Sequence, residues 1–141
     1  MTIDPTIYTR QKVIAALKAD ATLTAIVPAA RIYPQKTPDQ PTFPFIRMGA
    51  LSFQPLRGDG GAGGQATGAV HCFTKASAST PDAEAQAASI QRRMAEVIEA
   101  INDIDVSSLQ LSIHVTGGQL LMDAAEADCF HGLVNFDAVA T

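Results

Sequence analysis

The segment Thr80–Asn102, TPDAEAQAASIQRRMAEVIEAIN, decides which fold this chain can adopt. It predicts a helix over Pro81–Asn102, with Thr80 as the N-cap and Pro81 at the first helical position. Apolar side chains form one stripe at helical spacing, which comprises Ala83, Ala87, Ile90, Met94, Val97, Ile98 and Ile101. We expect this stripe to pack on a sheet. The opposite face is mainly acidic, whereas a membrane-surface helix carries lysine and arginine there.

Alternating segments on both sides of this helix predict the strands of that sheet. After it, Leu109–Val115 alternates apolar with polar residues, and Gly117-Gly118 is expected to end the strand. The last strand is predicted over about Cys129–Val139.

Two further strands are predicted before the helix, over Phe45–Phe53 and Ala66–Phe73. Between them, Gln54–Gln65 contains five glycines and predicts the long loop of a hairpin. A proline-rich crossing with a short extended piece at Arg31–Pro34 precedes the first of these strands.

The N-terminal part of the chain predicts a second helix. This helix is expected over Pro5–Ala19, with Asp4 as its N-cap. Its apolar face would comprise Ile7, Val13, Ile14, Leu17 and Ala21. Asp20 is expected to cap a short turn over Ala21–Val27. The predicted fold class is therefore α+β: one domain over residues 1–141, with a mostly antiparallel sheet, two helices on one face and one long glycine-rich hairpin loop.

Composition excludes several classes of protein. Of the 141 residues, 47% are hydrophobic and 17% charged, so the chain can bury a core and is not predicted to be disordered. No apolar run reaches the roughly 20 residues of a membrane span. The first residues do not resemble a signal peptide, and two cysteines favour a reducing compartment, so we expect a cytoplasmic protein.

Charge is distributed unevenly along the sequence. Residues 1–75 carry eight Lys/Arg and four Asp/Glu, whereas residues 76–141 carry two and ten. The net charge of −4 argues against a protein that coats nucleic acid, because phosphate binding needs clustered cations. The imbalance suggests a subunit with two electrically different sides.

Two arrangements could suggest ligand chemistry. Gly58, Gly60 and Gly63 match a dinucleotide-binding spacing, but no helix is predicted after them and no phosphate-binding lysine follows. A zinc site could be built from His71, Cys72, Cys129 and His131. Adjacent strand residues point to opposite faces, so buried thiols and partly exposed histidines are the preferred interpretation.

No motif predicts catalysis or a cofactor. A nucleophilic cysteine would need an orienting group and an oxyanion hole, and nothing in the sequence marks either. The carboxylates Asp123, Glu126 and Asp128 are interpreted as a solvated turn, because no metal-binding motif accompanies them. We therefore predict that the protein is not an enzyme, and that it binds no cofactor or metal.

The glycine-rich loop is instead predicted to be an assembly loop, because a neighbouring protein can select among the backbone states that glycine permits. The residues assigned to it are Gln54, Arg57, Asp59, Gly60, Gly61, Gly63 and Gly64.

The order of motifs resembles the tail-completion or tail-terminator proteins of long-tailed phages and phage-derived particles. The matching segments are Ala15–Asp20 with Leu23 and Val27, Arg31–Pro34, Phe43–Ile46 and Val70–Phe73. Together with the alanine-rich start of the later helix, they cover residues 7–101.

This resemblance implies a structural protein that forms a hexameric ring at the head-proximal end of a tail tube. The ring would stop tube growth and join the tail to the head connector, with DNA passing through its lumen. Its partners would be other copies of itself, the tail tube protein and a connector or stopper protein. It would be made in the cytoplasm of the producing bacterium and end in the tail-neck region of the particle.

The same resemblance suggests that Asp123, Glu126 and Asp128 face the lumen, where like charge would keep DNA from sticking. Two alternatives remain open at this point. One is another neck or tail-tube component of similar build, and the other is a small cytoplasmic enzyme or ligand-binding module.

Overall fold

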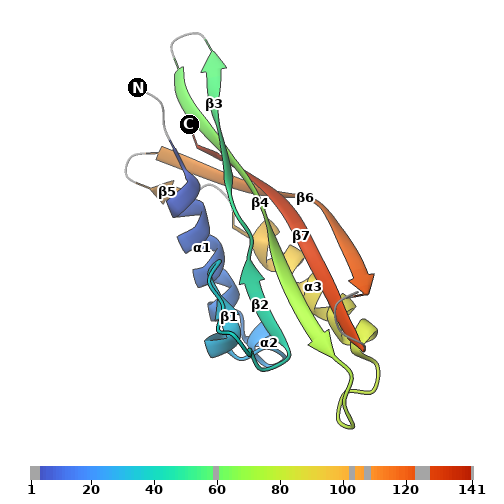
Figure 1. The fold of residues 1–141 in the computed structure, drawn as a ribbon. Coiled ribbons are helices and arrows are strands. Elements are labelled where there is room, and N and C mark those ends of the chain that lie inside the picture. The colour runs from blue at the N-terminus through green and yellow to red at the C-terminus, as the bar shows by residue number, and fades with distance from the viewer. Residues whose placement is uncertain (1–3, 59–60, 102–103, 107–108, 123–127, 141) are drawn as a thin grey trace.

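The computed structural model describes residues 4–58, 61–101, 104–106, 109–122 and 128–140. Within these residues, seven strands form one sheet in the order β1-β2-β4-β7-β6-β5, and β3 pairs with β4 beside this path. The helices α1 and α3 lie on the same face of the sheet (Figure 1). All strand pairs are antiparallel except β1 with β2, which confirms the predicted α+β class.

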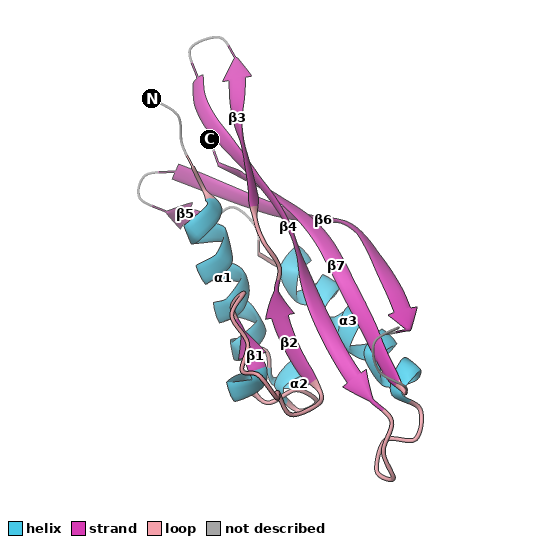
Figure 2. Ribbon diagram, in the orientation of Figure 1, coloured by secondary structure: helices cyan, strands magenta, loops and turns pink. Residues whose placement is uncertain are grey.

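The helices and strands follow one another in an order close to the predicted one. They are α1 (Thr6–Ala19), α2 (Ala21–Thr24), a 3-10 turn (Ala29–Arg31), β1 (Ile32–Tyr33), β2 (Phe45–Met48), β3 (Ser52–Gly58), β4 (Gly61–Lys75), α3 (Ala83–Glu99), β5 (Ile104–Val106), β6 (Leu109–Met122) and β7 (Cys129–Ala140). The short strand β5 was not predicted. Figure 2 shows that the β3–β4 hairpin projects past the end of α1.

Helix α3 forms the centre of the core, as its sequence predicts. Every residue of the predicted apolar stripe is buried. The N-cap is Asp82 rather than Thr80: its Oδ1 accepts a hydrogen bond from the Ala85 N–H at 3.0 Å, which is the contact that defines a cap. The helix ends at Glu99, short of the predicted end.

Helix α1 buries part of the face predicted for it. Val13 and Leu17 are buried as predicted, whereas Ile7 is 54% exposed and the buried Thr9 was not predicted. Thr9 can be buried because its Oγ1 donates to the Pro5 carbonyl at 2.8 Å. The N-cap is Pro5 rather than the predicted Asp4, whose Oδ1 accepts a hydrogen bond from the Thr6 N–H at 2.9 Å.

Asp20 links the short helix α2 to the central helix. Its Oδ2 accepts from the Leu23 N–H at 2.8 Å, which confirms the predicted cap. Arg93 of α3 donates to both carboxylate oxygens, from Nε at 2.8 Å and from Nη2 at 2.6 Å. These hydrogen bonds from Arg93 are the main cause that lowers the pKa of Asp20.

The predicted strand Phe45–Phe53 is two strands separated by a bulge. Met48 is paired with Val70, and Ser52 is paired with Thr67. The three residues 49–51 therefore oppose the two residues 68–69 of β4. The Leu51 side chain lies directly over Gly68, where any Cβ would collide with it. Glycine at this position therefore lets the bulge fold back onto β4.

The glycine-rich segment is strand rather than loop, which corrects the prediction for Gln54–Gln65. Gln54 and Arg57 lie in β3, and Gly61, Gly63 and Gly64 lie in β4. A Cβ on Gly63 would be 3.1 Å from the Ala140 carbonyl oxygen. These glycines pair with β3, and Gly64 also pairs with β7. The pairing offsets the entropic cost of ordering the glycines.

Gly117-Gly118 also does not end its strand. Strand β6 continues to Met122, with a bulge between Val115 and Gly117. A Cβ on Gly118 would lie 2.8 Å from Nε2 of Gln91, so the glycine leaves room for a side chain of α3. The sequence pattern did not reveal this use of the glycine pair.

Candidate assembly surfaces

An aromatic band crosses the sheet face that carries no helices. Phe45, Phe73, His131 and Leu121 are cross-strand neighbours on β2, β4, β7 and β6. The next row toward the centre comprises Tyr33, Arg47, His71, Leu133 and Gln119. These two rows define the aromatic band, and their strand neighbours Ile46 and Cys72 face the core instead.

The rings of the band are stacked on one another. Phe45 and Phe73 have centroids 4.8 Å apart, and Phe73 and His131 are separated by 4.3 Å. The guanidinium of Arg47 lies 5.3 Å from the Phe73 ring centroid. A hollow of about 480 Å³ lies beside the band, between these rings and Thr37–Pro41. Rings held in this way by their neighbours form a continuous aromatic surface.

The aromatic band was not predicted, although the sequence carries a signal for it. Phe45 and Arg47 alternate along β2, and His71, Phe73 and Lys75 alternate along β4. Only the pairing of β2 with β4 shows that these two alternating sets share one face.

The histidines considered for zinc are brought together, but the cysteines are not. Nδ1 of His71 lies 2.7 Å from Nε2 of His131. Cys72 faces the core, where its thiol lies 3.6 Å from the Ala87 carbonyl oxygen. Cys129 is opposite Lys75, on the other face of the sheet from Cys72. Within the described ranges, no three His, Cys, Asp or Glu side chains are grouped so as to hold a metal ion.

The half-buried position of His71 is expected to make stability depend on pH. Burial, with the nearby His131 and Arg47, lowers the pKa of His71 to about 4. The unfolded chain therefore binds a proton near pH 6.5 that the folded chain binds only near pH 4. The contribution of neutral His71 to the free energy of unfolding should be fully present above pH 6.5 and should be lost as the pH is lowered toward 4.

Urea unfolding at pH 7 and pH 4.5 measures this effect. The free energy of unfolding of the wild type should be about 1–2 kcal/mol lower at pH 4.5 than at pH 7. This is less than the pKa difference alone would give, because solvent screens the partly exposed ring. His71→Gln should lose less, whereas the exposed His114→Gln serves as the control and should behave like the wild type. An unchanged pH dependence in His71→Gln would contradict the assignment.

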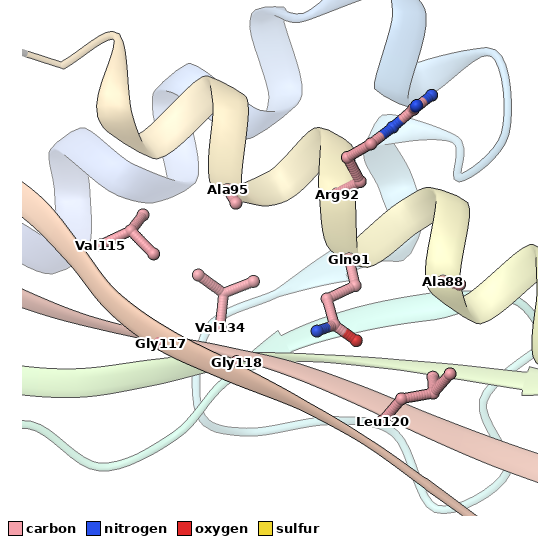
Figure 3. Close-up of a pocket in the computed structure, with 9 residues that line it drawn as sticks. All are labelled: Ala88, Gln91, Arg92, Ala95, Val115, Gly117, Gly118, Leu120 and Val134. Carbon is pink, nitrogen blue, oxygen red and sulfur yellow. The ribbon is translucent and has the colours of Figure 1, made fainter.

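A second surface lies between α3 and β6. It is a groove of about 310 Å³ whose lining is largely apolar. The lining comprises Ala88, Gln91, Arg92, Ala95, Val115, Gly117, Gly118, Leu120 and Val134. Figure 3 shows Gln91 pointing from α3 toward the strands, whereas Arg92 points away from them. Leu120 at one end of the groove is 38% exposed, and the next residue on that side of β6, Met122, is 72% exposed.

The residues predicted to act in assembly are only partly described. Gln54, Arg57, Gly61, Gly63 and Gly64 lie in the projecting β3–β4 hairpin. Asp59 and Gly60 lie outside the described residues, as do Asp123 and Glu126. Asp128 is exposed and has a φ of 62°, a left-handed conformation that aspartate tolerates better than most residues.

Comparison with known proteins connects this fold to a family. The family model for tail completion protein gp17 matches residues 11–141. The chain belongs to the gp17 family of tail completion proteins.

Solved structures share the fold of this tail completion protein. A chain from the virion of a native gene transfer agent particle aligns with a TM-score of 0.73 at 20% identity, covering 91% of this chain and 90% of that chain. A second solved structure, which carries no functional name, aligns with a TM-score of 0.52 at 13% identity, covering 93% and 95%. No curated protein sequence matches significantly.

Family membership identifies a structural component of a phage-type tail, and both surfaces are suited to contacts with other proteins. Among the described helices, none is long and apolar enough to cross a membrane.

Proposed function

We propose that this tail completion protein forms a hexameric ring at the head-proximal end of a tail tube, ends tube growth and joins the tail to the head connector. The observation that carries the proposal is the family match over residues 11–141. The gene transfer agent virion chain of the same fold supports it. The subunit also presents two different surfaces, the aromatic band and the groove between α3 and β6, and a closed ring with head-to-tail contacts requires two different patches.

In this proposal the β3–β4 hairpin contacts a neighbouring tail protein or the connector. The hairpin projects from the subunit as a two-stranded ribbon (Figure 1). The contact residues would be those assigned to the assembly segment, Gln54, Arg57, Asp59, Gly60, Gly61, Gly63 and Gly64. Subunits would assemble in the cytoplasm of the producing cell and end in the tail neck of the particle.

Mass photometry and negative-stain microscopy of the purified protein test the ring. We expect particles of six subunits with a central hole, and the same ring at the neck of tails from producing cells. Tails that keep normal length and head attachment without this protein would overturn the proposal. A protein that stacks into long tubes would instead be a tube component.

The proposed lumen passes DNA without binding it. Asp123, Glu126 and Asp128 would present one acidic cluster per subunit to the channel, and like charge repels phosphate. We expect no duplex binding at 0.15 M salt up to about 100 µM protein in fluorescence anisotropy, because there is little counterion release to drive it. Tight binding that weakens with salt would contradict a conduit.

Substitution of these three residues by lysine tests their position. DNA delivery should slow while ring formation persists. Unchanged delivery would place the acidic segment away from the channel.

A further inference from the structure

Arg10 of α1 carries a positive charge that the subunit does not neutralise. Its Nη2 donates to the Gly49 carbonyl at 3.0 Å, whereas its Nη1 is buried and has no hydrogen-bond partner among the residues that the structure describes. Within the same residues, no carboxylate forms an ion pair with it. Buried cations are normally paired, because an unused N–H away from water costs free energy. This guanidinium therefore lacks an anionic partner.

The side chain of Arg10 lines a pocket of about 260 Å³ between the first turns of α1 and the residues that lead into β3. The lining comprises Thr6, Ile7, Arg10, Gln35, Ala50 and Leu51, and none of these residues is acidic. The hydroxyl of Thr6 and the amide of Gln35 are neutral groups that can donate hydrogen bonds. Asp4, the nearest acid along the helix, is exposed and accepts from the Thr6 N–H. One cation with neutral donors and no acid favours an anionic ligand.

The pocket matches a carboxylate better than a phosphate group. A single guanidinium balances one negative charge, and its planar N–H groups fit the two oxygens of a carboxylate. A phosphate group carries up to about two negative charges at neutral pH, and the pocket offers one cation. The apolar side chains of Ile7, Ala50 and Leu51 suit the methylene groups of an aspartate or glutamate.

The pocket lies at the base of the β3–β4 hairpin. Ala50 and Leu51 come just before β3, and the hairpin projects past the end of α1 that carries the pocket (Figure 2). A protein that covers the hairpin along its length would therefore also reach the pocket. Residues 1–75, which contain both features, have more Lys/Arg than Asp/Glu, so an acidic partner would be complementary in charge.

We propose that the pocket at Arg10 binds an aspartate or glutamate side chain of the different tail protein or connector that the β3–β4 hairpin contacts. This inference rests on the proposed function and names the chemistry of one contact within it. The carboxylate accepts hydrogen bonds from N–H groups of Arg10 that the subunit leaves unused. Because the partner supplies the missing anion, the contact stabilises the assembled particle and not the free subunit.

Replacing Arg10 with methionine tests the contact, because methionine removes the charge and suits a half-buried position. The purified variant should keep its melting temperature within a few degrees and form rings like the wild type. The yield of intact particles should fall about tenfold or more, because a charge-assisted pair of hydrogen bonds is lost. Lys12→Met removes the same charge from an exposed position of α1 and is the control, which should assemble normally.

Carbodiimide coupling identifies the carboxylate directly. Arg10→Lys keeps the charge and places an amine in the pocket, and the reagent joins an amine to a carboxylate that touches it. In purified particles, mass spectrometry should find an amide between position 10 and an aspartate or glutamate of another tail protein. The wild type has no amine at this position and should not give this link. A link to an acid of a second copy of this chain would overturn the assignment of the partner.

The outcomes separate this contact from the ring itself. A normal yield of particles from Arg10→Met would overturn the pocket contact and leave the proposed function standing. A large fall in its melting temperature, or a loss of its rings, would also overturn the contact, because Arg10 would then act within the subunit or between copies. Wild-type protein that forms no ring in solution or on tails would overturn the proposed function.

Discussion

Replacing Ile90 with aspartate is expected to unfold the subunit. Ile90 is fully buried on α3, in the cluster where the helix meets the sheet. The substitution removes a large apolar side chain and places a carboxylate where only apolar groups can surround it. The free energy of unfolding should fall by about 5 kcal/mol or more, which is comparable with the entire stability of an ordinary domain. Circular dichroism during heating measures it.

The neighbouring Ser89 provides the matched control, because it is exposed on the same helix. Ser89→Asp adds the same charge and should change stability by about 0.5 kcal/mol or less. If Ile90→Asp melts cooperatively near the wild-type temperature, the stripe of α3 does not form the core.

Shortening the β3–β4 hairpin is expected to abolish assembly without unfolding the subunit. Leu56 and Gly63 are cross-strand partners, so Asn-Gly can replace residues 57–62 and close the shorter hairpin with a tight turn. The pairing of Gly64 with Ala140 and the whole core remain in place. We expect the melting temperature to stay within a few degrees while the yield of intact particles falls at least tenfold.

Thr67→Ser is the control for the shortened hairpin, because Thr67 is exposed on β4 outside the segment assigned to assembly, and this variant should support normal assembly. Particle yield equal to the wild type in the shortened variant would show that the hairpin end has no role in assembly.

Local pattern predicted most of the helices and strands, and it was least reliable at glycine. The stripe of α3 and the alternation in the last strand were sufficient, because each depends on a period within one segment. At Gly63, Gly64 and Gly118 the local propensity for a loop was overridden. Gly63 admits the backbone of Ala140 and Gly118 admits the side chain of Gln91, and both contacts come from distant parts of the chain.

The candidate surfaces were harder to predict than the strands. The hairpin was predicted as an assembly segment from its glycines, whereas the aromatic band and the groove were not. The side chains of the aromatic band and of the groove follow no pattern that would mark them within their own helix or strand. The groove combines small residues of α3 with the far end of β6, and nothing in either segment alone marks it.

The sequence by itself determined the α+β class, the central helix and, through its motifs, the resemblance to tail completion proteins. These depend on periodicity and on the order of short motifs, which a single chain displays without folding. Tertiary structure alone decided which residues share a face, that His71 meets His131, and that β5 pairs with Leu109–Leu111 of β6. These features depend on strand order and register. Register is set when the hydrophobic faces of several strands are buried together, and no single segment contains that information.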